Sequence, residues 1–128
     1  MMRAYFDSDV LIWHLRGADQ ARGFFDRFRK QKGYEMWTGA MQRAEVVFFM
    51  RDKEKEATLS FLSHFKCAPV DREIVDMAGE LYRKWNPGFG IDVNDAILAA
   101  AVKTGGGKIY TLNVKHYPMA DIIVEKPW

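Results

Sequence analysis

The stretch Ala4-Tyr5-Phe6-Asp7-Ser8-Asp9-Val10-Leu11-Ile12-Trp13-His14-Leu15 opens the chain and decides its fold. It begins with a short apolar run of strand type that ends at Asp7. Its second half predicts a helix, which the following Arg16-Gly17 ends. A strand followed so closely by a helix is typical of the first unit of an α/β domain, and it places Asp7 at the carboxyl end of the first strand.

The rest of the chain repeats this alternation. Further strands are expected at 34–37, 67–70, 108–112 and 122–124, and helices at 18–32, from Thr38 to about 50, at 51–65, 74–85 and 96–102. Thr38 and Asn94 are expected to cap helices, and Pro87-Gly88 to end one. The pattern predicts one domain over residues 1–128, an α/β fold of three α/β/α layers around a mostly parallel sheet of about four to five short strands.

Composition limits the class of protein. With 48% hydrophobic and 28% charged residues in 128 positions, the chain is expected to be a single globular domain and not a disordered one. The net charge of +2 permits a polyanionic partner without requiring one. The single cysteine, Cys67, excludes an internal disulfide or a cysteine-rich metal site, and no apolar run is long enough to span a bilayer. A cytoplasmic protein without a membrane segment or secretory leader is expected.

Three acidic residues stand out. Ligands of parallel sheets bind beyond the carboxyl ends of the strands, where Asp7 is predicted to lie. Glu45 has Met41, Phe48 and Phe49 as helical neighbours, and neither these nor Gln42 is basic. Asp95 begins a helix that is apolar almost all round.

Each acid also has an ordinary structural explanation. Asp7 and Asp95 can cap helices, and Glu45 can pair with a distant arginine. One hard divalent cation held by carboxylate oxygens explains all three together, and Mg²⁺ or Mn²⁺ fits such ligands. The three histidines lack the spacing of zinc ligands.

The same residues carry a resemblance to a known family. The opening segment resembles the strand-Asp-Thr-Asn-Val-Leu-Ile start of the PIN-domain ribonucleases, and within them of the VapC-type toxins of toxin–antitoxin pairs. Asn94-Asp95-Ala96-Ile97-Leu98-Ala99-Ala100 is similar to their Asp-Ala-hydrophobic-hydrophobic-Ala-Ala motif, and Glu45 falls where they have a helical glutamate. The likeness covers almost the whole chain.

One family motif is altered. After the fourth strand the family has Thr-Arg-Asn-x-x-Asp-Phe or Thr-Arg-Asp, whereas this chain reads Thr111-Leu112-Asn113-Val114-Lys115-His116-Tyr117. The fourth acid is missing. Whether Asn113 or His116 replaces it, whether Asp9 compensates, and whether one ion binds or two are left open.

The resemblance implies an endoribonuclease that uses Mg²⁺ or Mn²⁺ to hydrolyse phosphodiester bonds of RNA, often a transfer RNA, and that pairs with an antitoxin and forms a homodimer. Asp7, Glu45 and Asp95 are then the catalytic and metal-binding residues. The supporting residues expected around them are Ser8, Asp9, Asp92, Thr111, Asn113 and His116, and those expected to contact RNA are Arg43 and Lys115. The face formed by Phe24, Phe25 and Phe28 is interpreted as core, with a groove for an antitoxin segment as the alternative.

Two other functions remain possible from the sequence. Asp7-Ser8-Asp9-Val10 also fits the first motif of the haloacid-dehalogenase-like phosphatases, although the residues before their last acidic motif do not form a strand here. The missing fourth acid also permits a PIN fold that binds RNA or protein without activity.

Overall fold

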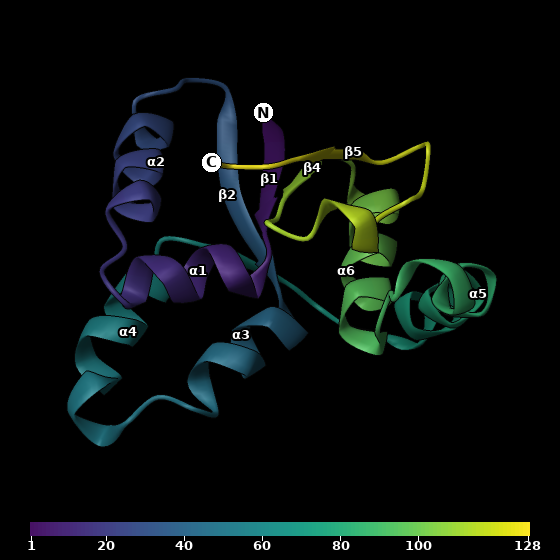
Figure 1. Ribbon diagram of the computed structural model, residues 1–128, viewed down its shortest axis with the longest axis horizontal. Coiled ribbons are helices and arrows are strands. Elements are labelled where there is room, and N and C mark those ends of the chain that lie inside the picture. The colour runs from purple at the N-terminus through teal and green to yellow at the C-terminus, as the bar shows by residue number, and fades with distance from the viewer.

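β1 (Met2–Phe6) lies at the centre of a five-stranded sheet in which every strand pairing is parallel. A computed structural model describes every residue from Met1 to Trp128. The strands lie in the order β3-β2-β1-β4-β5. The four strands besides β1 are β2 (Tyr34–Gly39), β3 (Lys66–Ala68), β4 (Lys108–Tyr110) and β5 (Ile123–Glu125). The predicted parallel α/β sheet is confirmed (Figure 1).

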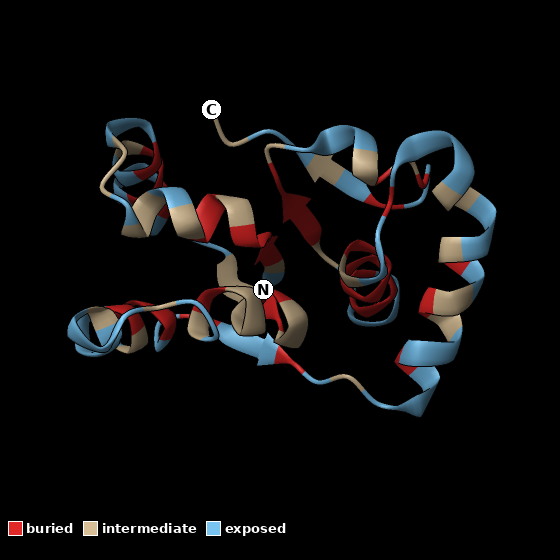
Figure 2. Ribbon diagram, turned by 60° about the horizontal axis from the view of Figure 1, so that its bottom comes forward, coloured by how far each residue is buried: buried red, intermediate tan, exposed pale blue.

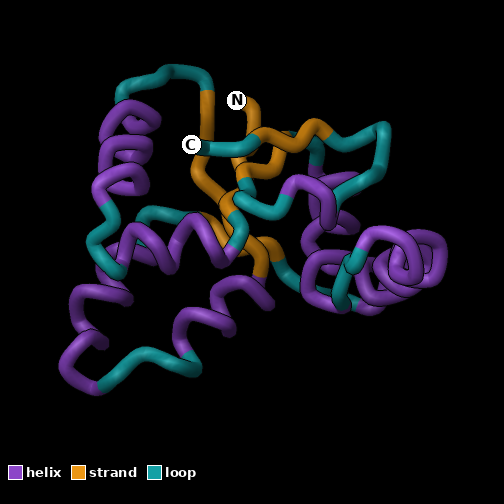
Figure 3. The backbone as a smooth tube through the Cα atoms, viewed as in Figure 1, coloured by secondary structure: helices purple, strands orange, loops and turns teal.

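Helices cover both faces of this sheet, so that the strands lie between two helical layers (Figure 3). The α-helices are α1 (Ser8–Leu15), α2 (Asp19–Arg29), α3 (Ala40–Val47), α4 (Lys55–Leu62), α5 (Arg72–Phe89) and α6 (Val93–Gly105). Two 3₁₀ turns, η1 (Asp52–Glu54) and η2 (Val114–His116), lie in the connections. None of the helices is long and apolar enough to cross a membrane.

Alternation along β1 divides the core in two. Ala4 and Phe6 join a cluster with residues of α1, α2 and α4, whereas Tyr5 joins a cluster with α5 and α6. This is the period of two expected of a strand buried on both faces. Figure 2 shows the buried residues concentrated in the central strands and in α6.

The aromatic face of α2 belongs to the core. Phe24, Phe25 and Phe28 are buried, and the last two place their ring centroids 5.2 Å from that of Phe6. The interpretation of this face as core is therefore confirmed, and the alternative of an open groove there is wrong. Buried aromatic pairs of this kind stabilise the packing beyond the area they bury.

Thr38 does not cap a helix as predicted. It is a residue of β2, paired with Cys67 of β3, and its hydroxyl donates to the carbonyl oxygen of Phe6 at 2.8 Å. Gly39 is the residue before α3, and a side chain there would collide with the amide of Gln42. α3 therefore begins one residue later than the capping preference of Thr38 predicts.

Two other helix ends also differ. α5 continues through Pro87 to Phe89 and ends at Gly90, whose φ of 68° suits glycine. α6 is capped by Asp92, whose carboxylate accepts a hydrogen bond from the amide of Asp95, and not by Asn94. These ends set the entry to α6, which carries Asp95 into the site.

Candidate functional site

Asp7 follows β1 directly, at the edge of the sheet where parallel strands end. Its amide donates to the carbonyl oxygen of Tyr110, so the end of β1 is tied to that of β4. The side chain is only 6% exposed. Its Oδ1 accepts the amide of Ser8 at 2.8 Å, and its Oδ2 accepts the hydroxyls of Thr111 at 3.0 Å and Tyr117 at 2.8 Å. Three hydrogen bonds thus fix the orientation of this carboxylate.

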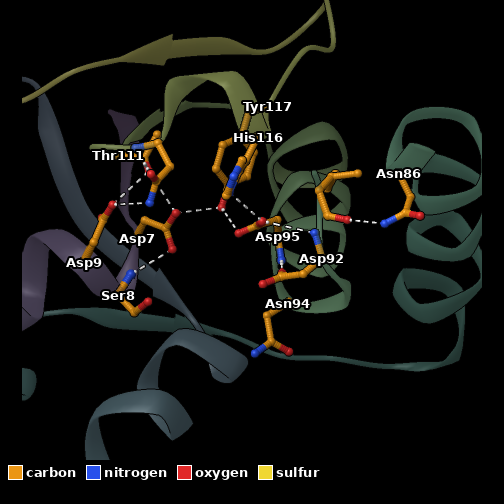
Figure 4. A network of polar contacts seen from close by, with 12 residues as sticks. Asp7, Ser8, Asp9, Asn86, Asp92, Asn94, Asp95, Thr111, His116 and Tyr117 are labelled. Atoms are coloured by element: carbon orange, nitrogen blue, oxygen red, sulfur yellow. Dashed lines mark hydrogen bonds and ion pairs between the residues drawn. The ribbon is translucent and has the colours of Figure 1, made fainter. Parts of the chain in front are cut away.

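Asp95 comes to the same place from α6. Its Oδ2 accepts the amide of Asp92 at 3.2 Å, completing a reciprocal cap of the helix. Its Oδ1 lies 3.1 Å from the Tyr117 hydroxyl, and Nδ1 of His116 lies 3.2 Å from Oδ2. The expected capping role is confirmed, and the same carboxylate also faces Asp7 across one hydroxyl group, as Figure 4 shows.

Glu45 lies beside this pair and is connected to it through neighbours. Its Oε2 accepts the hydroxyl of Ser8 at 3.2 Å, and its Oε1 accepts the side-chain amide of Asn94 at 3.2 Å. Ser8 and Asn94 are chain neighbours of Asp7 and Asp95. The predicted apolar surroundings of Glu45 are wrong in part, because Phe48 and Phe49 are 79% and 82% exposed.

These carboxyl groups prefer their neutral form more than usual. Burial raises the pKa of Asp7 and of Glu45. Burial and the nearby charge of Asp7 together raise the pKa of Asp95 to about 7. None of the four lysine and arginine ion pairs in the structure involves these acids. The site is therefore short of positive charge.

Asp9 is committed to the loop after β4. Its Oδ2 accepts the amide of Leu112 at 3.0 Å and the side-chain amide of Asn113 at 3.2 Å, and it lies 3.4 Å from the Thr111 hydroxyl, which donates to Asp7 at the shorter distance of 3.0 Å. Burial, together with the nearby charge of Asp7, raises the pKa of Asp9 to about 6. Asn113 presents its nitrogen, and not its oxygen, to this acid.

The remaining predicted residues surround these acids. Asp92 is exposed and serves as the cap of α6. Arg43 is half-buried on α3, two residues before Glu45, and Lys115 is exposed in η2. His116 is half-buried and in contact with Asp95.

The donor set fits a hard divalent cation. Asp7 and Asp95 each direct one oxygen to a common point. Both carboxylates are buried and neither has a lysine or arginine partner, so a bound cation would supply the missing positive charge. As it stands, the structure gathers no group of three or more histidine, cysteine, aspartate and glutamate side chains that could hold a metal ion. The pair is thus the core of the candidate site, and Glu45 stands next to it.

Tyr117 was not predicted as a site residue, although it is 3% exposed and contacts two of the acids. Its position beside His116, after the fourth strand, was the only sequence signal. Because 110 residues separate Tyr117 from Asp7 along the chain, no local sequence pattern predicts this contact.

Fold and site together define a small parallel α/β domain with an acidic centre at the carboxyl edge of its sheet. Residues 4–121 match the PIN domain. Ribonuclease VapC10 of Mycobacterium tuberculosis is 32% identical over 114 residues, which cover 88% of this chain and 84% of that protein. The chain belongs to the PIN-domain family.

Solved structures share the fold. A toxin–antitoxin complex from Klebsiella pneumoniae superposes with a TM-score of 0.79 at 19% identity, covering 98% of each chain. DNA-bound VapBC from Salmonella typhimurium superposes with a TM-score of 0.80 at 14% identity over the whole of both chains.

The phosphatase alternative does not hold. The segment Gly90 to Asp95 follows α5, a helix, whereas the last acidic motif of the haloacid-dehalogenase-like phosphatases should follow a strand. The membership in the PIN-domain family excludes that class independently.

Proposed function

We propose that this chain is a divalent-metal-dependent endoribonuclease and the toxin of a toxin–antitoxin pair. The observation that carries the proposal is the pairing of Asp7 and Asp95, two buried carboxylates that face one point at the carboxyl edge of the sheet. The relative named Ribonuclease VapC10 and the toxin–antitoxin complexes of the same fold support the substrate class and the setting.

Asp7 and Asp95 would hold Mg²⁺ or Mn²⁺, with Glu45 as the third acidic residue. When bound, such a cation supplies charge stabilisation for the phosphodiester and lowers the pKa of water. Thr111 and the amide of Ser8 keep the Asp7 carboxylate in place. No side-chain nucleophile is required by this chemistry.

Hydrogen bonds orient the Glu45 carboxylate at the same edge of the sheet. The Ser8 hydroxyl and the Asn94 amide each donate to one of its oxygens, so the carboxylate is oriented from both the β1 and the α6 sides. Its half-exposed position leaves it accessible to water and substrate. We assign it to orienting the attacking water or completing the metal site.

RNA requires positive charge around an acidic centre, because phosphates are otherwise repelled. Arg43 and Lys115 lie on elements next to the site and form none of the lysine and arginine ion pairs of the structure. We propose that they contact the phosphate backbone and position the strand rather than read its sequence.

The test is incubation of the purified chain with total cellular RNA in Mg²⁺, Mn²⁺ or a chelator. Cleavage with metal and none with chelator is expected for the native chain, and none in any condition for Asp7→Ala. Asp76→Asn, which removes an exposed carboxylate on α5, is the matched control and should cleave as the native chain does. Cleavage that survives both the chelator and Asp7→Ala contradicts the proposal.

The inactive binding module is the second candidate, because the fourth acid of the family pattern is absent. A Mn²⁺ titration followed by thermal melting separates the two functions. A melting temperature that rises with Mn²⁺ for the native chain but not for Asp7→Ala or Asp95→Asn supports the enzyme, and the absence of any such difference supports the binding module.

The antitoxin would bind near the same acids. An open groove of about 570 Å³ lies between α1, α3 and α4, and Glu45 and the 82% exposed Phe49 both line it. Exposed aromatic residues in a groove suit the apolar face of an amphipathic helix. We expect Phe49→Asp to abolish co-elution with the cognate antitoxin in size-exclusion chromatography while the fold persists. The homodimer stays a prediction, to be tested by sedimentation.

A further inference from the structure

Tyr117 places the only polar atom of its side chain between two acids. The ring belongs to the core cluster on the α5 and α6 side of the sheet, and the residue is 3% exposed. The hydroxyl oxygen lies 2.8 Å from Oδ2 of Asp7 and 3.1 Å from Oδ1 of Asp95. In Figure 4 it lies between the two carboxylates, which come from opposite sides.

One hydroxyl cannot satisfy both carboxylates. A phenol carries a single hydrogen, so when both acids are ionised it donates to Asp7 or to Asp95 but not to both at once. The pair remains short of one donor, and no lysine or arginine compensates for it. A divalent cation is the group that would satisfy both oxygens together.

The hydroxyl and a shared cation compete for the same point. Oδ2 of Asp7 already accepts hydroxyls from Thr111 and Tyr117, which use its lone pairs. Mg²⁺ needs oxygen ligands at about 2.0 to 2.1 Å in near-ideal geometry and tolerates little distortion. An ion that joins this oxygen to Oδ1 of Asp95 therefore has to displace the phenol from at least one of its two contacts.

We propose that Tyr117 is a positioning residue whose hydroxyl bridges Asp7 and Asp95 in the metal-free chain and gives up this bridge when a divalent cation binds. The inference rests on the proposed metal-dependent function. The role of this hydroxyl is to keep the two carboxylates close together in the metal-free chain. Because the hydroxyl competes with the ion, it also lowers the affinity for the ion.

The test compares Mn²⁺ binding by isothermal calorimetry in the native chain and Tyr117→Phe. The ring is kept, so the core packing is preserved. Loss of the competing hydrogen bond should tighten Mn²⁺ binding about tenfold, as expected for a hydrogen bond to a charged group. The melting temperature in chelator should fall in the same variant, because the two carboxylates lose their donor.

Tyr110→Phe is the matched control. Tyr110 is also buried, but its ring packs on Phe6 and Phe24 on the other face of the sheet. Removing its hydroxyl should leave Mn²⁺ binding unchanged. Equal tightening in both variants would overturn the inference, because the effect would not be specific to the bridge.

The bridge can also be tested in the native chain, where no variant has to fold. A buried, hydrogen-bonded tyrosine hydroxyl gives a slowly exchanging proton resonance, and saturating Mg²⁺ should shift or remove that of Tyr117. A resonance unchanged at saturation, or unchanged or weaker Mn²⁺ binding by Tyr117→Phe, overturns the bridge and leaves the proposed function standing. Absence of Mn²⁺ binding by both proteins overturns both.

Discussion

Asp9 accepts a hydrogen bond from the backbone amide of Leu112 at 3.0 Å, so an acid that follows β1 holds the loop that follows β4. This is the loop in which the family pattern has its fourth acid and this chain has none. Asp9 thus brings a carboxylate to that loop from another part of the sequence. Its hydrogen bonds from the Leu112 amide and the Asn113 side chain, however, assign it to holding the loop.

Asp9→Ala should therefore destabilise the chain more than it weakens metal binding. The Leu112 amide would lose its partner, at an expected loss of about 1–3 kcal/mol in the free energy of unfolding. Thermal or urea unfolding in chelator measures this change. Complete loss of Mn²⁺ binding with unchanged stability would show instead that Asp9 is a metal ligand.

Asp7→Asn should abolish Mn²⁺ binding and yet raise the melting temperature in chelator. The amide removes a buried charge that has no basic partner, and the hydroxyls of Thr111 and Tyr117 can turn to accept from it. Each kcal/mol gained should raise the melting temperature by roughly 3–5 °C. A lower melting temperature together with intact Mn²⁺ binding would contradict the assignment of Asp7 to the metal.

Ser8→Ala should slow RNA cleavage about 2- to 10-fold, the effect of losing one hydrogen bond. The Ser8 hydroxyl orients Glu45, and its loss frees that carboxylate without removing it. Ser63→Ala removes an exposed hydroxyl that bonds the carbonyl oxygen of Ser60, and it is the control. Initial rates on one RNA substrate compare the two, and equal rates in both variants would deny Ser8 this role.

The stability of the metal-free chain should fall as the pH rises from about 5 to about 8. The pKa of Asp95 is raised to about 7 in the fold from an ordinary 3.8, so the native state binds more protons than the unfolded state between these values. Stability due to this group is then fully present below pH 4 and is lost as the pH rises through about 7.

Asp95→Asn isolates this contribution, because an amide does not titrate. The melting temperature of the variant minus that of the native chain, both in chelator, should increase from about pH 5 to about pH 8. A difference that stays constant over this range, or decreases, would contradict the raised pKa.

The parallel sheet was predictable because it depends on local patterns. Apolar runs such as Ala4–Phe6 alternate with amphipathic segments, and only a few α/β arrangements satisfy that order. Helix ends were less predictable. Thr38 is a good cap residue, but its pairing with Cys67 in the sheet outweighs that preference, and Pro87 is tolerated in the last turn of α5, which ends only at Gly90.

The sequence singled out three acids of the candidate site, whose role stays a prediction, but it did not indicate the contacts between them. Asp7 stands out because it ends the first strand, Glu45 because it lacks a local basic partner, and Asp95 because it begins an apolar helix. The hydrogen bonds of Tyr117 to Asp7 and of Asn94 to Glu45 join segments far apart in the chain, and no local pattern encodes them. The exposure of Phe48 and Phe49 depends likewise on how α3 ends against its neighbours.

The most direct measurement is anomalous X-ray scattering from crystals of the chain soaked in Mn²⁺. We expect one strong peak between the carboxylates of Asp7 and Asp95, with Glu45 beside it, and no such peak in crystals of Asp7→Asn. A Mn²⁺ ion bound elsewhere with this pair still bridged by Tyr117, or a peak that persists in Asp7→Asn, would contradict the shared metal site.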